Sequence, residues 1–265
     1  MIEVRSLRVV RGDTVAVDDV ALSVAPGEFV VILGRSGAGK TTFLRALNRL
    51  VEPTRGHVTI DGRDVTGAAP SELRAIRRRI GMVFQQFNLV RRASVLENVL
   101  AGRLGWVAPW PSLAGRFPES DRRLARECLD QVGLAHLADR RADTLSGGEQ
   151  QRVAIARALA QSPVVILADE PTASLDPQLT TTIMDILRRI NTERGLTLVV
   201  SQHQLETARA YATRIVGFRH GRVVFDGPPS AVTPVAVAAI YGSAADDATP
   251  QGGHGGSAAR PPCSK

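Results

Sequence analysis

A glycine-rich stretch between an apolar run and a helical pattern constrains the fold most strongly. Residues 29–33 are consecutive apolar residues, which predicts a buried strand. From Phe43 to Leu50 the apolar residues recur with helical spacing. Between them, glycine followed by Lys40 and Thr41 at a helix start is the phosphate-binding pattern in its confirming context of strand, loop and helix. The loop consists of Gly34, Arg35, Ser36, Gly37, Ala38, Gly39, Lys40, Thr41 and Thr42.

This loop has the chemistry to hold the phosphates of ATP. Glycines let backbone N–H groups curl around a phosphate chain, and the following helix offers free N–H groups and a positive dipole end. Lys40 can reach the β- and γ-phosphates, and the Thr41 hydroxyl can bind Mg²⁺. The alternative is a glycine-rich turn that binds nothing. A chance match in a chain this long occurs roughly once in a hundred, which favours the phosphate site.

Size and composition indicate one large α/β domain that is soluble or peripheral to a membrane. The chain has 265 residues and only two cysteines, Cys128 and Cys263, without metal-site spacing, so we expect a reduced compartment. Residues 1–5 do not resemble a signal peptide. The longest uncharged stretch, residues 227–245, contains prolines and small residues and is a poor membrane span.

The net charge of +7 comes largely from arginine clusters at residues 77–79, 91–92, 122–123 and 140–141. A basic surface can bind nucleic acid or an anionic membrane. No aromatic residues interleave with these arginines, so we favour solvated helix faces and expect no nucleic-acid partner.

The order of the patterns predicts an α/β fold: a P-loop NTPase core with an antiparallel β subdomain and an inserted α-helical subdomain. Short apolar runs before the loop, at 4–9, 15–17 and 20–24, predict antiparallel strands. A single domain is expected over 1–241, with the helical insert at about 87–160. The Gly-, Ala-, Pro- and Asp-rich residues 242–265 predict a disordered tail.

Two adjacent carboxylates, Asp169 and Glu170, follow the apolar strand predicted at 164–168. Ligands of α/β sheets bind at the carboxyl ends of the strands. Asp169 would hold Mg²⁺ through water, and Glu170 would polarise the attacking water. The alternative is a strand end with two solvated acids, which would be preferred if the phosphate-binding loop were absent.

A second helix start with bare glycines lies at residues 144–152. Ser146 is a good N-cap, and the glycines behind it leave backbone N–H groups free for an anion. Together with the phosphate-binding loop and the Asp169–Glu170 pair, Leu-Ser-Gly-Gly-Glu-Gln at 145–150 resembles the signature of the ATP-binding cassette family. The resemblance covers about residues 1–230.

The resemblance implies roles for further residues. Gln85 matches the glutamine that contacts Mg²⁺ and senses a transmembrane partner, and residues 174–176, which include Asp176, match the D-loop. His203 matches the histidine that contacts the γ-phosphate; the alternative is a satisfied histidine at a strand end. The family works as a head-to-tail homodimer with ATP at the interface. In that arrangement the partner's nucleotide would be contacted by Ser146, Gly147 and Gly148.

One position departs from the family pattern. The family usually stacks adenine on an aromatic residue before the strand that precedes the loop, and here that place falls on Arg11, beside Val10. A guanidinium plane can also stack on a base, so Arg11 is the candidate for the adenine contact.

Several stretches are similar to the ATPase subunits of phosphonate importers: residues 84–90, 101–117 and 202–204. This similarity implies permease subunits as partners, indirect coupling to a periplasmic or lipoprotein binding protein, and a peripheral location at the cytoplasmic face of the bacterial inner membrane. Phosphate, phosphite or amino acids are alternative solutes. A cytosolic ATPase acting on DNA or ribosomes, and a regulatory protein without turnover, are alternatives of other classes.

Both tryptophans, Trp106 and Trp110, lie in a proline- and glycine-rich stretch after Gln85. One interpretation is that this stretch shapes a permease-docking surface; the other is that both rings pack under the helices of the insert.

Overall fold

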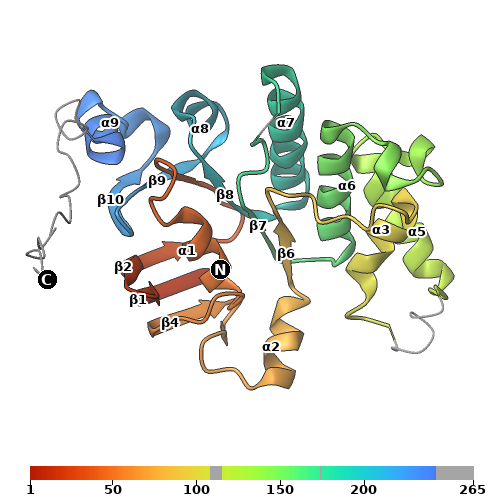
Figure 1. The fold of residues 1–265 in the computed structure, drawn as a ribbon, viewed down its shortest axis with the longest axis horizontal. Helices are drawn as coiled ribbons and strands as arrows, with labels where there is room; N and C mark the ends of the chain where they lie inside the picture. Colours follow the sequence, from red (N-terminus) through yellow and green to blue (C-terminus); the bar gives the residue numbers. More distant parts are fainter. Residues whose placement is uncertain (108–114, 174, 243–265) are drawn as a thin grey trace, which may run out of the picture.

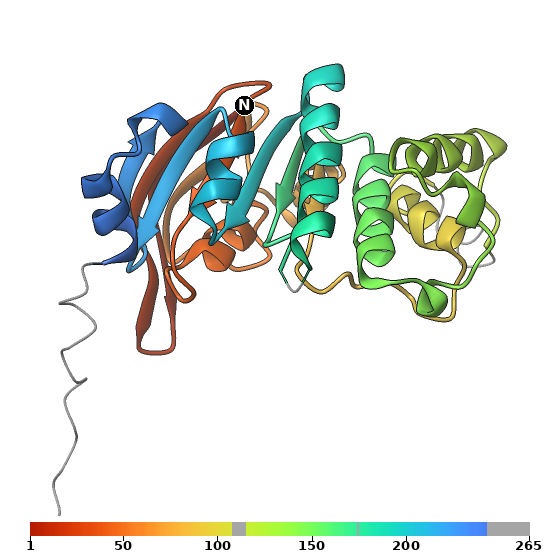
Figure 2. The same ribbon diagram turned by 90° about the horizontal axis from the view of Figure 1, so that it is seen from above.

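The computed structural model describes residues 1–107, 115–173 and 175–242. Figures 1 and 2 show a central sheet with an antiparallel sheet on one side and a cluster of helices on the other. Trp110, Ser174 of the predicted D-loop and nearly all of the predicted tail lie outside the described residues.

The N-terminal residues form the antiparallel sheet that the sequence predicts. Alternate residues of the first strand, such as Leu7 and Val9, are buried under it. The apolar runs at 15–17 and 20–24, expected as separate strands, belong to one long strand that bends. Register shifts mark this bend, beside positive φ angles of 47° at Ser6 and 53° at Asp19. The strands are β1 (Ile2–Arg11), β2 (Thr14–Val24), β4 (Arg55–Ile60) and β5 (Arg63–Asp64), in the order β2-β1-β4-β5.

The central sheet carries the glycine loop at the end of one of its inner strands. Its order is β10-β9-β3-β8-β7-β6, and all neighbours are parallel except β10, which pairs antiparallel with β9. The carboxyl ends of the parallel strands therefore meet at one edge. The strands are β3 (Phe29–Leu33), β6 (Ile80–Val83), β7 (Val165–Ala168), β8 (Thr197–Gln202), β9 (Arg214–Arg219) and β10 (Arg222–Gly227).

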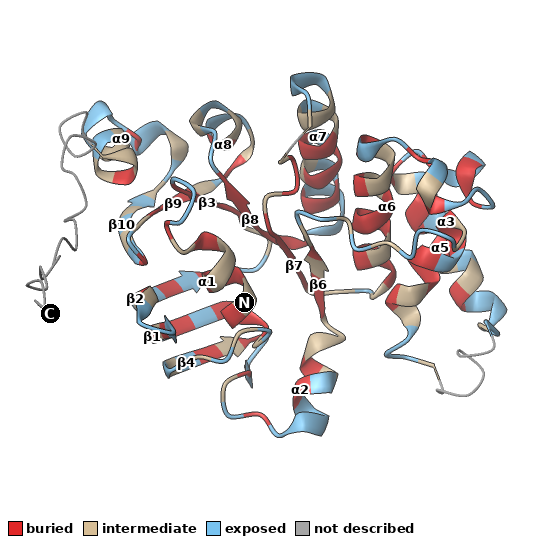
Figure 3. Cartoon of the chain, in the orientation of Figure 1, coloured by how far each residue is buried: buried red, intermediate tan, exposed pale blue. Residues whose placement is uncertain are grey.

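Apolar residues cover both faces of this sheet, which is why its central strands are continuous apolar runs. Val30 and Ile32 of β3 pack with Phe43 and the antiparallel sheet, whereas Val31 and Leu33 belong to the core on the other face. Figure 3 shows these strands as buried. The helices outside the helical cluster are α1 (Lys40–Leu47), α2 (Pro70–Arg77), α7 (Pro177–Arg194), α8 (Leu205–Tyr211) and α9 (Pro234–Tyr241), with the 3₁₀ turn η4 (Pro229–Ala231).

A cluster of helices lies between β6 and β7 in the chain, where the sequence predicts the insert (Figure 1). Ser94 begins its first helix with a capping box: its hydroxyl accepts from Glu97 N, and the Glu97 carboxylate accepts from Ser94 N. The cluster contains α3 (Val95–Leu100), α5 (Glu119–Gln131) and α6 (Gly147–Ala160), with the 3₁₀ turns η1 (Ala101–Arg103), η2 (Ala135–Leu137) and η3 (Ala142–Thr144).

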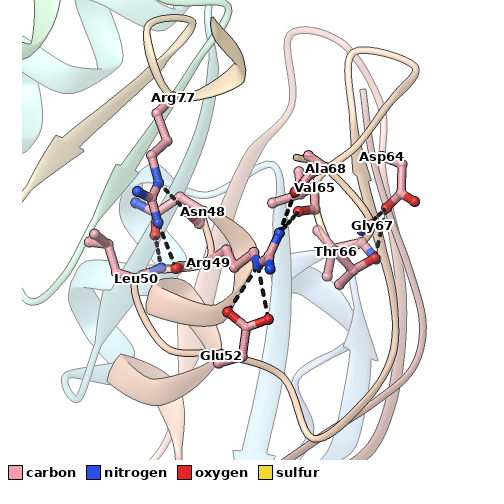
Figure 4. A network of polar contacts seen from close by, with 11 residues as sticks. Asn48, Arg49, Leu50, Glu52, Asp64, Val65, Thr66, Gly67, Ala68 and Arg77 are labelled. Atoms are coloured by element: carbon pink, nitrogen blue, oxygen red, sulfur yellow. Dashed lines mark hydrogen bonds and ion pairs between the residues drawn. The ribbon is translucent and has the colours of Figure 1, made fainter. Parts of the chain in front are cut away.

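The end of α1 is held by two arginines, as Figure 4 shows. Arg77 of α2 donates to the carbonyls of Asn48 (3.0 Å) and Arg49 (2.7 Å). Arg49 in turn donates to the Ala68 carbonyl at 2.8 Å and to the Glu52 carboxylate at 2.9 Å. The last carbonyls of a helix lack partners within it, so these bonds fix the helix that begins at the glycine loop.

Helix α9 was not predicted from the sequence. Thr233 caps it by accepting from Ala236 N, and Pro234 occupies its first turn, where the missing N–H costs nothing. Within the described residues, no helix combines the length and the apolar character that crossing a bilayer requires.

Candidate functional site

The glycine loop has a conformation that requires glycine. Gly37 and Gly39 have φ angles of 81° and 102°, and a Cβ on Gly39 would lie 2.3 Å from the Ala16 carbonyl oxygen. A Cβ on Gly34 would lie 2.4 Å from the carbonyl oxygen of Phe218. The loop is thus wound tightly between the start of β2 and the end of β9.

A cavity of about 420 Å³ opens over this loop. It brings together most of the loop, the glutamine at the edge of the helical insert and the carboxylate after β7. It also contains residues that the sequence analysis did not predict, from the start of β2 and the β9–β10 turn. The cavity is lined by Thr14, Val15, Ala16, Ser36, Gly37, Gly39, Lys40, Thr41, Thr42, Gln85, Glu170, His220 and Gly221.

The Lys40 ammonium is buried beside the cavity, with only 3% of the residue exposed. Its Nζ donates to the carbonyls of Gly34 (2.8 Å) and Arg35 (3.0 Å) and lies 3.3 Å from Glu170 Oε1. A buried ammonium needs partners of this kind. Because Lys40 lines the cavity, its charge is available to an anion that enters.

Asp169 is almost completely buried and has polar partners on both carboxylate oxygens. Thr41 Oγ1, 128 residues away in the sequence, donates to its Oδ1 at 2.8 Å. Ser201 Oγ also donates to Oδ1, at 3.2 Å, and the Arg45 guanidinium lies 3.4 Å from Oδ2. The structure therefore joins two of the predicted metal ligands, Thr41 and Asp169.

This donor set fits Mg²⁺. Among the described residues, no group of three His, Cys, Asp or Glu residues could hold a metal ion. Mg²⁺ does not need such a group, because it keeps several waters and uses one or two protein oxygens together with substrate phosphates. The Thr41 hydroxyl and the Asp169 carboxylate are oxygens of that kind, and the third predicted ligand, Gln85, lines the same cavity.

Glu170 follows the carboxyl end of β7 and has a strained backbone conformation. Its φ is 46°, which is uncommon for a residue with a side chain, and its N–H donates to Ser201 Oγ at 2.8 Å. Strain of this kind persists where the surroundings enforce it and clusters at active sites. Ser201 thus holds the Glu170 backbone and the Asp169 carboxylate together.

His203 follows β8 and lies at a neighbouring cavity of about 420 Å³. Glu170 and Ser36 line both cavities, so the predicted base lies between the glycine loop and the histidine. This second cavity also contains Arg35 of the loop and Tyr241 of α9. The sequence analysis did not predict a role for Tyr241.

The predicted signature residues lie at the start of α6 and do not line the cavity of their own chain. Ser146 Oγ accepts from Glu149 N, and Ser146 N donates to Glu149 Oε2 at 2.8 Å. Ser146 and Gly147 are exposed, whereas Gly148 is buried. Asp176 is also exposed and caps α7 through a bond from Leu179 N at 2.9 Å.

Arg11 lies at the exposed end of β1 and is not among the residues that line the cavity. On the side of the cavity formed by the antiparallel sheet, the lining residues are instead Thr14, Val15 and Ala16 at the start of β2. The ring of His220, from the β9–β10 turn, also lines the cavity. The adenine contact of Arg11 stays a prediction.

Trp106 lies against two arginines and is 44% exposed. The guanidinium carbons of Arg78 and Arg103 lie 5.0 and 5.3 Å from its ring centroid. Its Nε1 donates to the Gln161 carbonyl at 3.1 Å, which fixes the ring against the insert. A contact with a permease stays a prediction for this segment.

Comparison with known proteins identifies the family. The sequence model described as "ABC transporter" matches residues 17–173, more than half of the chain. The chain belongs to the ABC transporter family. Its relatives in this family include the "Phosphonates import ATP-binding protein PhnC" of Bradyrhizobium diazoefficiens, 52% identical over 93% of this chain and 92% of that protein. The protein of the same name from Staphylococcus saprophyticus is 49% identical over 88% of this chain and 91% of its own length.

Solved structures of ABC family members have the same fold. One is a dimeric ATP-binding cassette in a post-hydrolysis state bound to ADP and Pi. It is 38% identical, with a TM-score of 0.76 over 86% of this chain and 99% of that chain. Another is cbiO1 from Clostridium perfringens, described as "Part of the ABC transporter complex cbiONQ". It is 30% identical, with a TM-score of 0.77 over 89% of this chain and 92% of that chain.

Proposed function

We propose that this chain is the ATP-hydrolysing subunit of a bacterial phosphonate importer. The observation that carries the ATPase assignment is the convergence of Lys40, Thr41 and Glu170 at one cavity, with the buried Asp169 bonded to Thr41. Phosphonate is supported as the solute because about half of the aligned positions are identical in relatives named for phosphonate import.

Each residue at the cavity has a separate task in this proposal. Lys40 and the N–H groups of the loop bind the phosphates, and Glu170 accepts a proton from the attacking water. His203 contacts the terminal phosphate from the neighbouring cavity. Bound Mg²⁺, held by Thr41, Asp169 through water, and Gln85, would neutralise charge on the phosphates.

The active unit in this proposal is a homodimer. In one chain the signature at Ser146 does not line the cavity over Lys40, so the two phosphate-binding helix starts serve different nucleotides. A partner chain would place its Ser146, Gly147 and Gly148, and its Asp176, against the nucleotide held by the first chain. A related cassette is described as dimeric with ADP and Pi bound, which supports the arrangement.

The other partners follow from the importer assignment. Permease subunits would dock near Gln85, and a binding protein would act through them without touching this chain. The chain would be attached at the cytoplasmic face of the inner membrane as a peripheral subunit. Alternative solutes are phosphate, phosphite and amino acids. A cytosolic role on DNA or ribosomes is the alternative of another class, and the relatives named for phosphonate import favour the importer over it.

Solute uptake tests the proposed function. A strain lacking the gene should lose uptake of radiolabelled 2-aminoethylphosphonate and regain it with the wild-type gene but not with Lys40→Ala. Uptake of phosphate and amino acids is measured in the same cells. If the strain lacking the gene kept phosphonate uptake but lost uptake of another solute, that solute would replace phosphonate as the proposed substrate. Purification of the chain with ribosomes or DNA instead of a permease would replace the function.

Two similar helix caps separate stability from function. Ser94 caps α3 and Ser146 caps α6, each in a capping box with a glutamate. Replacing either serine by alanine should cost about 1 kcal/mol of unfolding free energy. Only Ser146→Ala should also weaken ATP-dependent dimerisation, because only this hydroxyl is expected to contact a partner's nucleotide. Denaturant unfolding and light scattering with ATP measure the two effects, and equal dimerisation of both variants would contradict the assignment.

A further inference from the structure

The last helix of the described chain reaches the loop that carries His203. Tyr241 Oη donates to the His203 carbonyl at 2.8 Å. Helix α9 is anchored beneath this contact by Ile240, which is 1% exposed and packs over Gly217 of β9. A Cβ on Gly217 would lie 2.5 Å from Ile240 Cγ1, so the helix approaches the sheet where glycine leaves room.

Tyr241 also contacts the glycine loop. Arg35 Nη1 donates to the Tyr241 carbonyl at 3.3 Å. Tyr241, Arg35 and His203 line one cavity together with Glu170. The end of α9 therefore connects the phosphate-binding loop to the segment of His203.

The segment of His203 is short. His203 and Gln204 join β8, which ends at Gln202, to α8, which begins at Leu205. His203 itself is exposed, so packing does not fix its position. The hydrogen bond from Tyr241 to its carbonyl restrains the backbone from which the imidazole projects.

We propose that Tyr241 is a positioning residue for ATP hydrolysis: its hydroxyl holds the His203 backbone so that the imidazole faces the cavity beside Glu170. This inference rests on the proposed ATPase function. Burial raises the pKa of Tyr241 to about 12, so the hydroxyl remains a donor throughout the neutral range.

The chain offers a matched control for the removal of this hydroxyl. Tyr211 of α8 donates to Asp185 Oδ1 at 2.7 Å and has its pKa raised to about 12, chiefly by burial. It lines neither the cavity over Lys40 nor the cavity at His203. Tyr211→Phe and Tyr241→Phe each remove one hydroxyl and keep the ring.

Steady-state hydrolysis by the full chain is the first test. Losing a hydrogen bond of about 1 kcal/mol lowers the equilibrium constant for correct placement of the histidine about fivefold. Tyr241→Phe should therefore lower kcat by up to about fivefold with the KM for ATP unchanged, because the phosphate contacts of Lys40 remain. Tyr211→Phe should keep the kcat of the wild type. Equal kcat in wild type and Tyr241→Phe would overturn the positioning role, whereas a wild-type chain without turnover would overturn the proposed function.

Histidine NMR of the nucleotide-free chain is the second test and does not depend on activity. The chain has five histidines, so ¹⁵N-histidine spectra are simple, and His203→Gln assigns the relevant signal. Tyr241→Phe should shift the His203 signal and speed amide exchange at Leu205 and its neighbours. Tyr211→Phe should leave the His203 signal unchanged. A His203 signal that is the same in wild type and Tyr241→Phe would overturn the inference, whatever the activity of the variant.

Discussion

Replacing Glu170 by glutamine should slow ATP hydrolysis by about 10²-fold or more and leave ATP bound. Glutamine has the same shape but cannot accept the proton of the attacking water. Glu170 Oε1 also lies 3.3 Å from Lys40 Nζ, so the substitution removes a negative charge that opposes the phosphates. Single-turnover hydrolysis of radiolabelled ATP measures the rate, and filter binding measures retention.

Glu206→Gln is the matched control for this variant. Glu206 has an 86% exposed side chain on α8 and pairs only at 3.8 Å with Arg209. Losing its charge should change neither the rate nor ATP retention. Hydrolysis at the normal rate by Glu170→Gln would remove Glu170 from the role of general base.

Replacing Lys40 by alanine should weaken ATP binding by about 10- to 100-fold, since a hydrogen bond to a charged group is worth about 1.5–3 kcal/mol. Arginine should rescue little of the loss. The Lys40 ammonium fits between the carbonyls of Gly34 and Arg35 as a compact donor, whereas a guanidinium is planar and wider. Titration calorimetry gives the affinity, and circular dichroism checks that each variant is folded. Full ATP affinity in Lys40→Ala would contradict the role of Lys40.

The parts of the site that lie within a single loop or helix could be predicted from local sequence patterns. The glycine loop and the cap at Ser146 both follow from signals within a few residues. Thr41 and Asp169 were each predicted as Mg²⁺ ligands, and the structure brings them into contact although 128 residues separate them, because strand ends of a parallel sheet meet at one edge.

Contacts that depend on strand order or on a distant element could not be predicted. Ser201 binds Asp169 and Glu170 only because β8 lies beside β7. A serine after an apolar run could have indicated that Ser201 belongs to the site, but not that it binds Asp169 and Glu170. Tyr241 depends on the docking of α9, for which Thr233 before a proline was a local signal. The bend in β2 depends on how this strand pairs with β1, and the apolar runs of the sequence do not specify that pairing.

The central claim is that two copies of the chain enclose ATP between the Lys40 loop of one and the Ser146 helix start of the other. The most direct measurement is the molar mass of the Glu170→Gln chain by light scattering, with and without ATP and Mg²⁺. The account predicts a change from the 28.3 kDa monomer to a dimer with ATP, abolished by adding Lys40→Ala or Ser146→Arg. A chain that stays monomeric at saturating ATP, or a dimer that forms despite either substitution, would contradict it.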